Sequence, residues 1–289
     1  MKPAVFDYQA PRTVEGVIEL LREHGAEARV LAGGQSLVPM LNLRVLKPAV
    51  LIDLNRCEPL SYVRREGDWI AVGAMARQLD TMDDPLVRKH CPLVSKAIEH
   101  AGPVAVRSRA TVGGTIAHAD RVAELPVAAM TLDAMMVIDG INGRRTVPAN
   151  AFFVADLTTA IVPGEFLCEV RFPVCAAHAI STFQEVSVRQ EGVAVVGLAS
   201  YIVLDAGAVS HIALTAMGVD GCPVRLHQTE ALVREQGLDA EGLIEAAMAC
   251  ARAEIDPSTD PYATAAYRTH TVGVLVQRAL RGAIEQRTA

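Results

Sequence analysis

Two short segments that each contain a pair of glycines constrain the fold of this 289-residue chain more than any other feature of its sequence. They are residues 32–37 (AGGQSL) and residues 111–120 (TVGGTIAHAD), and each lies against apolar sequence. Glycine lets a backbone adopt positive φ and approach a ligand closely, so that successive amide N–H groups can face an anionic oxygen. Two such loops suit a pyrophosphate bound from both sides, whereas glycine pairs that only form tight turns are the alternative.

The apolar pattern predicts an α/β unit around the first of these loops. Val14, Val17, Ile18 and Leu21 recur at helical spacing before Gly25, and short strands are expected over 29–32 and 50–53. The elements expected further along are a strand over 69–72, a solvated acidic loop over 80–84, a helix over 86–100 that Pro92 bends or splits, a helix over 125–132, a hairpin of 135–138 with 144–147, and a strand over 165–172.

The last third of the chain has a different pattern. Residues 181–188, 194–205 and 209–217 are strand-like and suit three antiparallel strands, and the chain from residue 229 onward is helical. Since a chain of this length exceeds the usual size of one domain, we expect an α+β protein of two domains. The first covers 1–175, in subdomains of about 1–56 and 57–175, and the second covers 176–289.

Composition excludes several classes of function. The net charge is −6 and no Lys/Arg run occurs, which argues against a nucleic-acid partner. The longest apolar run, 193–204, is too short for a membrane span, and the first residues do not form a signal peptide, so a cytoplasmic location is expected. The six cysteines form no C-x-x-C pair, so no metal or iron–sulfur site is predicted in this chain.

Other nucleotide and catalytic signatures are missing from the sequence. It has no G-x-G-x-x-G, no G-x-x-x-x-G-K-[ST], no G-x-S-x-G and no H-E-x-x-H. No catalytic residue is therefore predicted. The residues alone indicate a protein that binds an anionic or dinucleotide ligand.

Three motifs carry a more specific resemblance. Residues 32–39 (AGGQSLVP), the stretch 106–133 around TVGGTIAHAD, and residues 164–173 (GEFLCEVRFP) resemble, in order and spacing, motifs of the FAD-binding medium subunits of the xanthine oxidase/carbon monoxide dehydrogenase family of molybdenum hydroxylases. The resemblance covers essentially the whole chain. It implies a vanillyl-alcohol-oxidase-like (PCMH-type) FAD-binding domain of two subdomains, followed by a C-terminal domain with a small antiparallel sheet and helices.

The same resemblance implies a function and partners. A medium subunit holds FAD non-covalently and passes electrons to an external acceptor. It receives them from a small subunit with two [2Fe–2S] clusters, which in turn is reduced by a large subunit with molybdopterin, in a dimer of heterotrimers. An assembly subunit with weakened or lost FAD binding, and a stand-alone FAD oxidase of the same fold, are the alternatives. The organic substrate and the acceptor stay open.

The resemblance also assigns binding residues. Residues implied to contact FAD are Ala32, Gly33, Gly34, Gln35, Ser36 and Leu37 around the pyrophosphate, Thr111, Gly114 and Thr115 from the other side, His118, Asp120 and Glu124 beyond them, Phe166 or Leu167 at the adenine end, and Glu185. Asp120 is the candidate acceptor for FAD hydroxyl groups.

At several positions the chain departs from the family pattern. Ser108 and Ala110 replace an asparagine and a glycine of R-N-x-G-T, and Glu185 replaces the lysine of F-x-K. In R-x-x-[GD]-[DE]-[FY]-A, the last three family positions before alanine read Glu191, Gly192 and Val193, so no aromatic shields the flavin. These substitutions are expected to alter flavin exposure or affinity.

Overall fold

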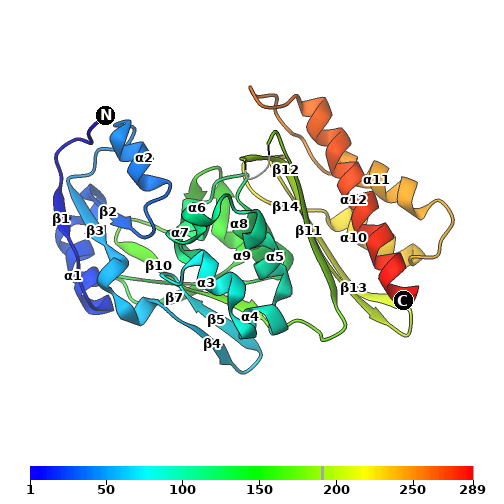
Figure 1. Ribbon diagram of the computed structural model, residues 1–289, viewed down its shortest axis with the longest axis horizontal. Coiled ribbons are helices and arrows are strands. Elements are labelled where there is room, and N and C mark those ends of the chain that lie inside the picture. Colours follow the sequence, from blue (N-terminus) through cyan, green and yellow to red (C-terminus); the bar gives the residue numbers. More distant parts are fainter. Residues whose placement is uncertain (190–191, 289) are drawn as a thin grey trace.

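The computed structural model describes residues 1–189 and 192–288 (Figure 1). Three lobes follow one another along the chain: an N-terminal lobe, a middle lobe and a C-terminal lobe. Gln190 and Glu191, which belong to the R-x-x-[GD]-[DE]-[FY]-A segment, lie outside the described residues.

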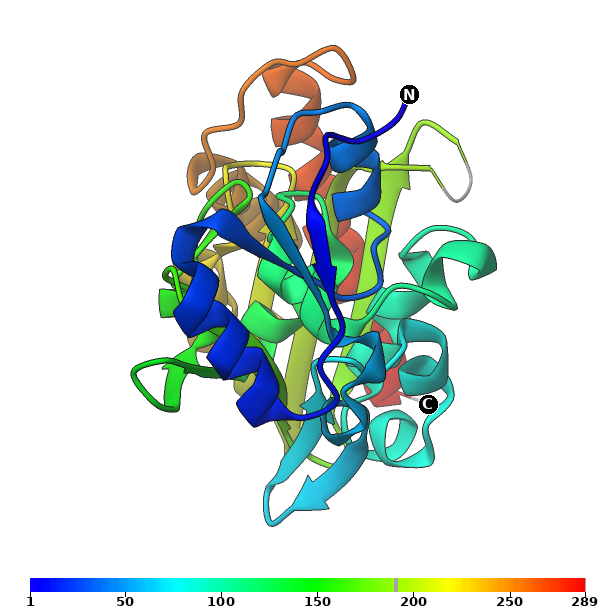
Figure 2. The same cartoon turned by 90° about the vertical axis from the view of Figure 1, so that its left-hand side faces the viewer.

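The N-terminal lobe is a small parallel sheet with one long helix. Its strands have the order β1-β3-β2. Val50 of the central strand lies opposite Asp7 on one side and opposite Ala28 on the other. Its elements are β1 (Asp7–Gln9), α1 (Val14–His24), η1 (Gly25–Glu27), β2 (Ala28–Leu31), α2 (Leu37–Asn42), β3 (Val50–Asp53), η2 (Leu54–Arg56) and η3 (Glu58–Leu60). Figure 2 looks onto this lobe, with α1 beside the three strands.

Local chemistry explains both ends of α1. The Thr13 hydroxyl caps its start by accepting a hydrogen bond from the Gly16 amide at 3.1 Å. Gly25 ends it with a φ of 51°, a conformation that glycine adopts without strain. The apolar face of the helix buries Val17 and Leu21 against the sheet, as the spacing predicted.

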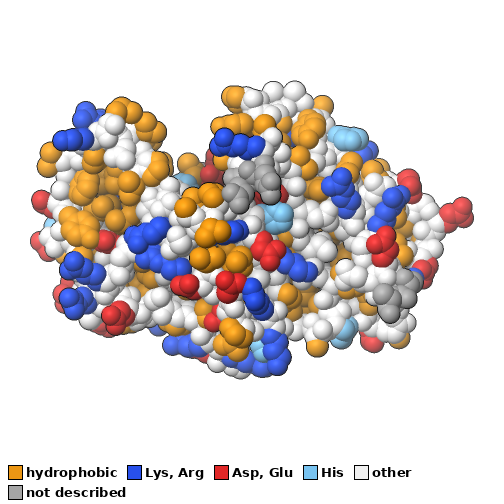
Figure 3. Space-filling model, viewed as in Figure 1, with side chains coloured by type: hydrophobic (Ala, Val, Ile, Leu, Met, Phe, Trp, Pro, Cys, Tyr) orange, Lys and Arg blue, Asp and Glu red, His pale blue; other side chains and the backbone are white. Residues whose placement is uncertain are grey.

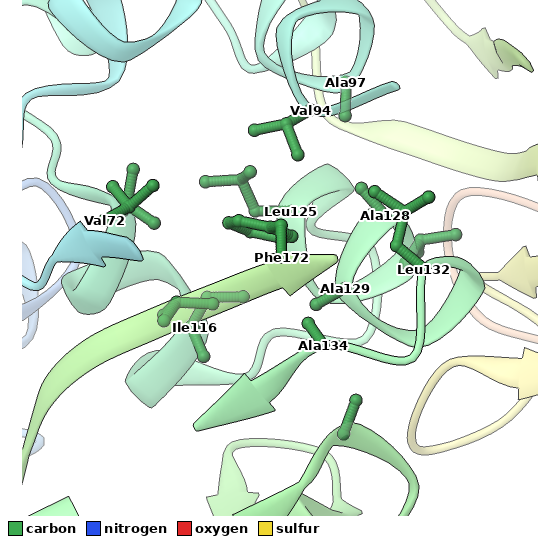
Figure 4. Packing of buried hydrophobic residues seen from close by; sticks show 14 of the residues in the cluster. Val72, Val94, Ala97, Ile116, Leu125, Ala128, Ala129, Leu132, Ala134 and Phe172 are labelled. Atoms are coloured by element: carbon green, nitrogen blue, oxygen red, sulfur yellow. The ribbon is translucent and has the colours of Figure 1, made fainter. Parts of the chain in front are cut away.

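The middle lobe is an antiparallel sheet of five strands in the order β4-β5-β10-β6-β7, covered by helices. Its elements are β4 (Val63–Glu66), β5 (Trp69–Gly73), α3 (Gln78–Asp83), α4 (Pro85–His90), α5 (Pro92–His100), α6 (Val104–Arg107), α7 (Val112–His118), α8 (Glu124–Thr131), β6 (Met135–Gly140), β7 (Arg145–Pro148), α9 (Ala149–Phe152), β8 (Phe153–Ala155), β9 (Thr158–Thr159) and β10 (Glu165–Pro173). Figure 4 shows its core, where Phe172 of β10 meets Ile116, Leu125 and Val94 of α7, α8 and α5.

The C-terminal lobe is an antiparallel sheet that lies between two layers of helices. Its elements are β11 (Ile180–Ser187), β12 (Ala194–Asp205), β13 (Ala208–Met217), β14 (Val224–Arg225), α10 (His227–Gln236), α11 (Leu243–Ala253) and α12 (Ala265–Thr288). Helices α10 and α12 pack on one face of the sheet, and α5 and α8 of the middle lobe pack on the other (Figure 1). This packing joins the middle and C-terminal lobes.

The α+β class and the arrangement of a bipartite first part with a C-terminal sheet and helices are confirmed. Pro92 splits the expected helix 86–100 into α4 and α5 at Cys91. The solvated loop expected over 80–84 is wrong, because residues 78–83 form α3 and bury Thr81. The C-terminal sheet has a fourth strand, β14, that the three-strand prediction lacked. Within the described residues, no helix has the length and apolar character needed to cross a membrane.

Candidate functional site

The two glycine loops lie directly against each other. Gly33 is packed so tightly that a Cβ there would lie 2.3 Å from the Arg109 carbonyl oxygen and 2.8 Å from the Ala110 Cα. A Cβ on Gly114 would lie 3.2 Å from the Cβ of Ala32. Figure 3 shows the surface hollowed between the N-terminal lobe and the rest of the molecule, and Figure 1 shows α7 beneath the same gap. The cleft therefore has a glycine-rich floor built from both motifs.

The first loop carries amide groups that its own fold leaves unused. It joins β2 to α2, and Gly34 adopts a φ of 77°. Within the described residues, the amides of Gly33, Gly34, Gln35 and Ser36 donate to no protein acceptor. The Gln35 side chain instead donates to the Gly33 carbonyl at 3.2 Å and fixes the turn. Four consecutive free N–H groups next to a left-handed glycine suit an anionic oxygen.

The second loop uses its amides internally. The amides of Val112 and Gly113 donate to the carbonyls of Ala76 and Ala74, both at 3.0 Å, and the Gly114 amide donates to the Thr111 hydroxyl at 3.0 Å. Thr111 is thus the N-cap of α7. The amides of Val112, Gly113 and Gly114 are therefore engaged within the protein, in contrast to those of the first loop, and the predicted contacts of Thr111, Gly114 and Thr115 with a ligand stay predictions.

Thr115 offers a side chain on this wall. Its hydroxyl oxygen accepts a hydrogen bond from Gln78 Nε2 at 2.7 Å. The hydroxyl proton of Thr115 is consequently directed away from Gln78 and is available to an acceptor. Gln78 is buried, and its backbone N–H donates to the Ala110 carbonyl at 2.9 Å. Gln78 therefore links α3 to the second loop through both its side chain and its backbone.

Two polar residues that the sequence analysis missed connect the loops. Asn55 Nδ2 donates to the Ala32 carbonyl at 2.9 Å, and Asn55 Oδ1 accepts from Arg77 at 2.6 Å. Arg77 also donates to the Arg109 carbonyl at 2.5 Å. Asn55 and Arg77 therefore hold the first loop against the second. Asn55 lies in the 3₁₀ turn after β3, and Arg77 lies four residues after the end of β5. Their position shortly after a buried strand is the one sequence signal that could have found them.

His118 and Asp120 lie at the far end of α7. The helix ends at Ala119, whose φ is 51°, so the chain turns sharply between the two side chains. Both are half-buried. One carboxylate oxygen of Asp120 accepts from the Val122 amide at 3.0 Å and shapes the turn toward α8, which leaves the other oxygen for a ligand.

Glu124 and Glu185 come together farther along. Glu124 is the first residue of α8, and Glu185 lies on β11 with a side chain only 8% exposed. His100 Nδ1 is 3.7 Å from Glu185 Oε1, which raises the pKa of His100. Burial, followed by the charge of Glu185, raises the pKa of Glu124 to about 8. Glu185 stands where the family pattern has a lysine, and its neighbour in the fold is His100.

Phe166 and Leu167 lie in β10 and point into two different cores. Phe166 packs with the N-terminal lobe and Leu167 with the middle lobe, at 3% and 4% exposure. Neither offers an open surface to an adenine ring, so the adenine contact stays a prediction that their burial does not support.

The departures near the second loop are accommodated by the fold. Ala110 is not one of the described residues that adopt a positive φ, so an alanine causes no backbone strain at this position, where the family has glycine. The Ser108 hydroxyl donates to the Ala105 carbonyl at 3.0 Å. Arg107, considered for a phosphate, is buried and donates to the carbonyls of Ile98 and Glu99. Val193 is 65% exposed.

Two half-open hollows lie in other parts of the described chain. One of about 300 Å³ is lined by residues between Ala26 and Ala49 on the outer side of the N-terminal lobe. Another of about 400 Å³ lies at the junction of the middle and C-terminal lobes, next to Trp69 and Tyr201.

Comparison with known proteins decides the family. The profile of the FAD binding domain in molybdopterin dehydrogenase matches residues 4–175, and that of the CO dehydrogenase flavoprotein C-terminal domain matches residues 181–283. The chain belongs to this family of FAD-binding subunits. The carbon monoxide dehydrogenase medium chain of Hydrogenophaga pseudoflava is 33% identical, with 98% of each chain covered. The 6-hydroxypseudooxynicotine dehydrogenase complex subunit alpha of Paenarthrobacter nicotinovorans is also 33% identical, over 99% of this chain and 97% of the relative.

A solved structure extends this likeness to three dimensions. The carbon monoxide dehydrogenase of H. pseudoflava that lacks the Mo-pyranopterin moiety of its molybdenum cofactor matches with a TM-score of 0.95 and 34% identity, covering 99% of both chains. The resemblance drawn from the three motifs is therefore confirmed, as are FAD as the cofactor and the assignment to a flavoprotein subunit of a multi-subunit molybdenum-containing oxidoreductase. The free amides at Gly33–Ser36 fit the pyrophosphate of this FAD-binding subunit.

Proposed function

We propose that this chain binds one FAD non-covalently in the cleft between its glycine loops and relays electrons through it. In this proposal electrons come from a small subunit with two [2Fe–2S] clusters, reduced in turn by a molybdopterin-containing large subunit, and leave to an external acceptor. The relatives named as a medium chain and as a complex subunit support such an assembly. A dimer of heterotrimers is the arrangement proposed.

One observation carries the proposal. The amides of Gly33, Gly34, Gln35 and Ser36 are unpaired among the described residues, and Gly33 has no room for a side chain. Gly33 and Gly34 are half-buried, and Gln35 and Ser36 are exposed, so all four N–H groups can be reached by an anionic ligand. The half-buried pair gains most from an acceptor, because unpaired N–H groups away from water are costly. A pyrophosphate has enough oxygens for all four.

The remaining roles follow from placement along the cleft. The Thr115 hydroxyl and the free oxygen of Asp120 lie on the α7 side, where they would meet ribityl or ribose hydroxyls. His118 orders the same turn. Glu124 and Glu185 would lie nearer the flavin ring, beyond the end of α7. When bound, FAD supplies redox chemistry that none of these side chains has.

The domain division proposed is 1–175 for FAD binding, with subdomains of about 1–56 and 57–175, and 176–289 for the C-terminal domain. The cleft lies where the two subdomains meet, since Ala32 comes from the first and Thr111 from the second. A cytoplasmic location is part of the same proposal. No organic substrate is proposed, because its chemistry takes place on the molybdenum subunit.

The decisive experiment is a flavin assay on natively purified protein. Denaturation should release about one FAD per chain, detected by chromatography with fluorescence, and no flavin should stay attached to the polypeptide. Small and large subunits should copurify when the three chains are produced together. Absence of flavin, both in the complex and after incubation of the chain with excess FAD, would refute the binding role and support the assembly-subunit alternative.

A further inference from the structure

The turn that follows α7 is fixed by one residue, Arg121, through three separate contacts. The Arg121 amide donates to Asp156 Oδ1 at 3.2 Å, and the Arg121 carbonyl accepts a hydrogen bond from the Gly218 amide at 3.0 Å. The Arg121 guanidinium donates to Asp260 Oδ2 at 2.6 Å. The three partners follow β8, β13 and α11 respectively, so they belong to three different segments of the chain. The turn therefore cannot shift without breaking several of these contacts.

The C-terminal lobe holds its side of these contacts firmly. Arg268 of α12 donates to Asp260 Oδ2 at 2.6 Å, and Asp260 Oδ1 accepts from two backbone amides of its own loop. The Arg268 side chain is only 2% exposed, and it also donates to the Gly218 carbonyl at 2.7 Å and to the Val195 carbonyl. Gly218 has a φ of 71°, and a Cβ there would lie 2.2 Å from the Val195 carbonyl oxygen. Both groups that reach Arg121 from this lobe are thus fixed by the same buried arginine.

This network fixes a position more than it adds stability. The side chains of Arg121 and Asp260 are 25% and 15% exposed, so both lose much of their hydration when they pair. That loss offsets most of the attraction, and ion pairs removed from water therefore contribute little net stability. The main effect of the pair is geometric, since it sets the distance between a turn of the middle lobe and a loop of the C-terminal lobe.

The turn that Arg121 fixes also carries Asp120. Asp120 Oδ1 accepts from the Val122 amide at 3.0 Å, and the Asp120 carbonyl accepts from the Ala123 amide at 3.0 Å. Side chain and backbone of Asp120 therefore both belong to the turn. Helix α7 has seven residues, which places the turn about 10 Å from the second glycine loop, at the other end of the helix.

We propose that Arg121 is a positioning residue through which the C-terminal lobe holds Asp120 in place for a hydroxyl group of FAD. This inference rests on the proposed function, in which the second oxygen of Asp120 meets ribityl or ribose hydroxyls. The guanidinium of Arg121 is engaged by Asp260, so Arg121 acts through Asp120 and not as a ligand of FAD. The C-terminal lobe thereby contributes to FAD binding, although both glycine loops precede it in the chain.

The FAD affinity of the full chain provides the main test. Arg121→Ala should raise the Kd for FAD about tenfold, the effect of losing one hydrogen bond to a charged acceptor. Arg121→Lys keeps a cation beside Asp260 and should restore most of the affinity. Arg287→Ala removes another Arg–Asp pair of the C-terminal lobe, the one with Asp239, and is the matched control that should keep wild-type affinity.

A double-mutant cycle tests whether Arg121 acts through Asp120. Asp120→Ala removes the carboxylate that the turn carries. In that background Arg121→Ala should cause no further rise in the Kd for FAD, because two residues that serve one interaction have non-additive effects. Full additivity of the two changes would overturn the positioning role.

Hydrogen exchange of the chain without flavin tests the anchoring itself. Followed by mass spectrometry, peptides that span residues 119–123 should exchange faster in Arg121→Ala than in the wild type or in Arg287→Ala. An unchanged exchange rate in Arg121→Ala would show that the contact does not hold the turn, and would overturn the proposal.

Two further outcomes separate this inference from the proposed function. A lower thermal midpoint of Arg121→Ala with an unchanged Kd for FAD would mean that the network only joins the lobes, and would refute the positioning role alone. A wild-type chain that binds no FAD, in the complex or by itself, would refute the proposed function and the positioning role together.

Discussion

Replacing Gly33 by alanine tests the geometry of the cleft most directly. The new Cβ would lie 2.3 Å from the Arg109 carbonyl oxygen and 2.8 Å from the Ala110 Cα, against 3.4 Å or more for an ordinary contact. The two loops must therefore separate by roughly 1 Å, and both neighbours are backbone atoms that cannot rotate away. Overpacking of this kind costs about 1–3 kcal/mol. Because Gly33 begins the run of four free amides, the same displacement moves those donors off the pyrophosphate.

The expected loss of FAD affinity follows from the hydrogen bonds that the displaced amides would no longer make. A hydrogen bond to a charged group contributes about 1.5–3 kcal/mol, and each 1.4 kcal/mol changes an affinity tenfold. Loss of one such bond in Gly33→Ala should raise the Kd for FAD roughly 10- to 100-fold, measured by titration of FAD fluorescence. Gly282→Ala is the control, because no atom lies within 4 Å of its Cβ position on α12. Wild-type FAD affinity and thermal midpoint in Gly33→Ala would refute the close contact of the loops.

Three further predictions concern other parts of the molecule. Asn55→Ala removes the link from Arg77 to the Ala32 carbonyl and should weaken FAD binding about fivefold, the equivalent of one ordinary hydrogen bond of about 1 kcal/mol, with an unchanged circular dichroism spectrum as the check on folding. Glu124→Gln should alter pH-dependent stability: burial raises the pKa of Glu124 from 4.5 to about 8 in the folded chain, so the wild-type unfolding free energy should fall by roughly 4 kcal/mol between pH 5 and pH 8.5, and urea denaturation of the variant should lack most of this fall. Phe172→Ala empties the centre of the middle-lobe core and should cost about 3–5 kcal/mol by the same denaturation, and a loss below 1 kcal/mol would contradict that core.

Elements with strong local signals were predictable from the sequence. The spacing of Val14, Val17 and Leu21 identified α1, and Pro92 identified the break between α4 and α5 because its ring and missing N–H oppose a continuous helix. β1 was missed because its three residues are all exposed and its pairing with β3 joins positions far apart in sequence. Helix α3 was missed because Asp80, Asp83 and Asp84 indicated a solvated loop, although the face that carries Gln78 and Thr81 is buried.

The site was predictable in composition but not in hydrogen bonding. The two motifs identified the residues that meet, yet nothing in the letters distinguishes the free amides of Gly33–Ser36 from the engaged amides of Val112–Gly114. That difference depends on acceptors from the segment that follows β5, the carbonyls of Ala74 and Ala76, which only the tertiary fold brings into place. Asn55 and Arg77 belong to no motif, and their role likewise depends on tertiary contacts.

The departures from the family pattern separate into two groups once they are placed in the fold. Ala110 faces Gly33, and only Gly33 has to lack a side chain. A Cβ on Gly33 would collide with the Ala110 backbone. Ala110 itself has no positive φ, and its methyl group is buried. The contact between the two glycine loops is therefore intact, and Ala110 by itself is not expected to weaken the proposed binding of FAD. Glu185 lies instead within β11, and Val193 is an exposed residue directly before β12. At position 185 the family pattern has a lysine, and this chain instead keeps a buried carboxyl group 3.7 Å from His100, whose pKa the contact raises, so the substitution exchanges a single cation for a His–Glu pair.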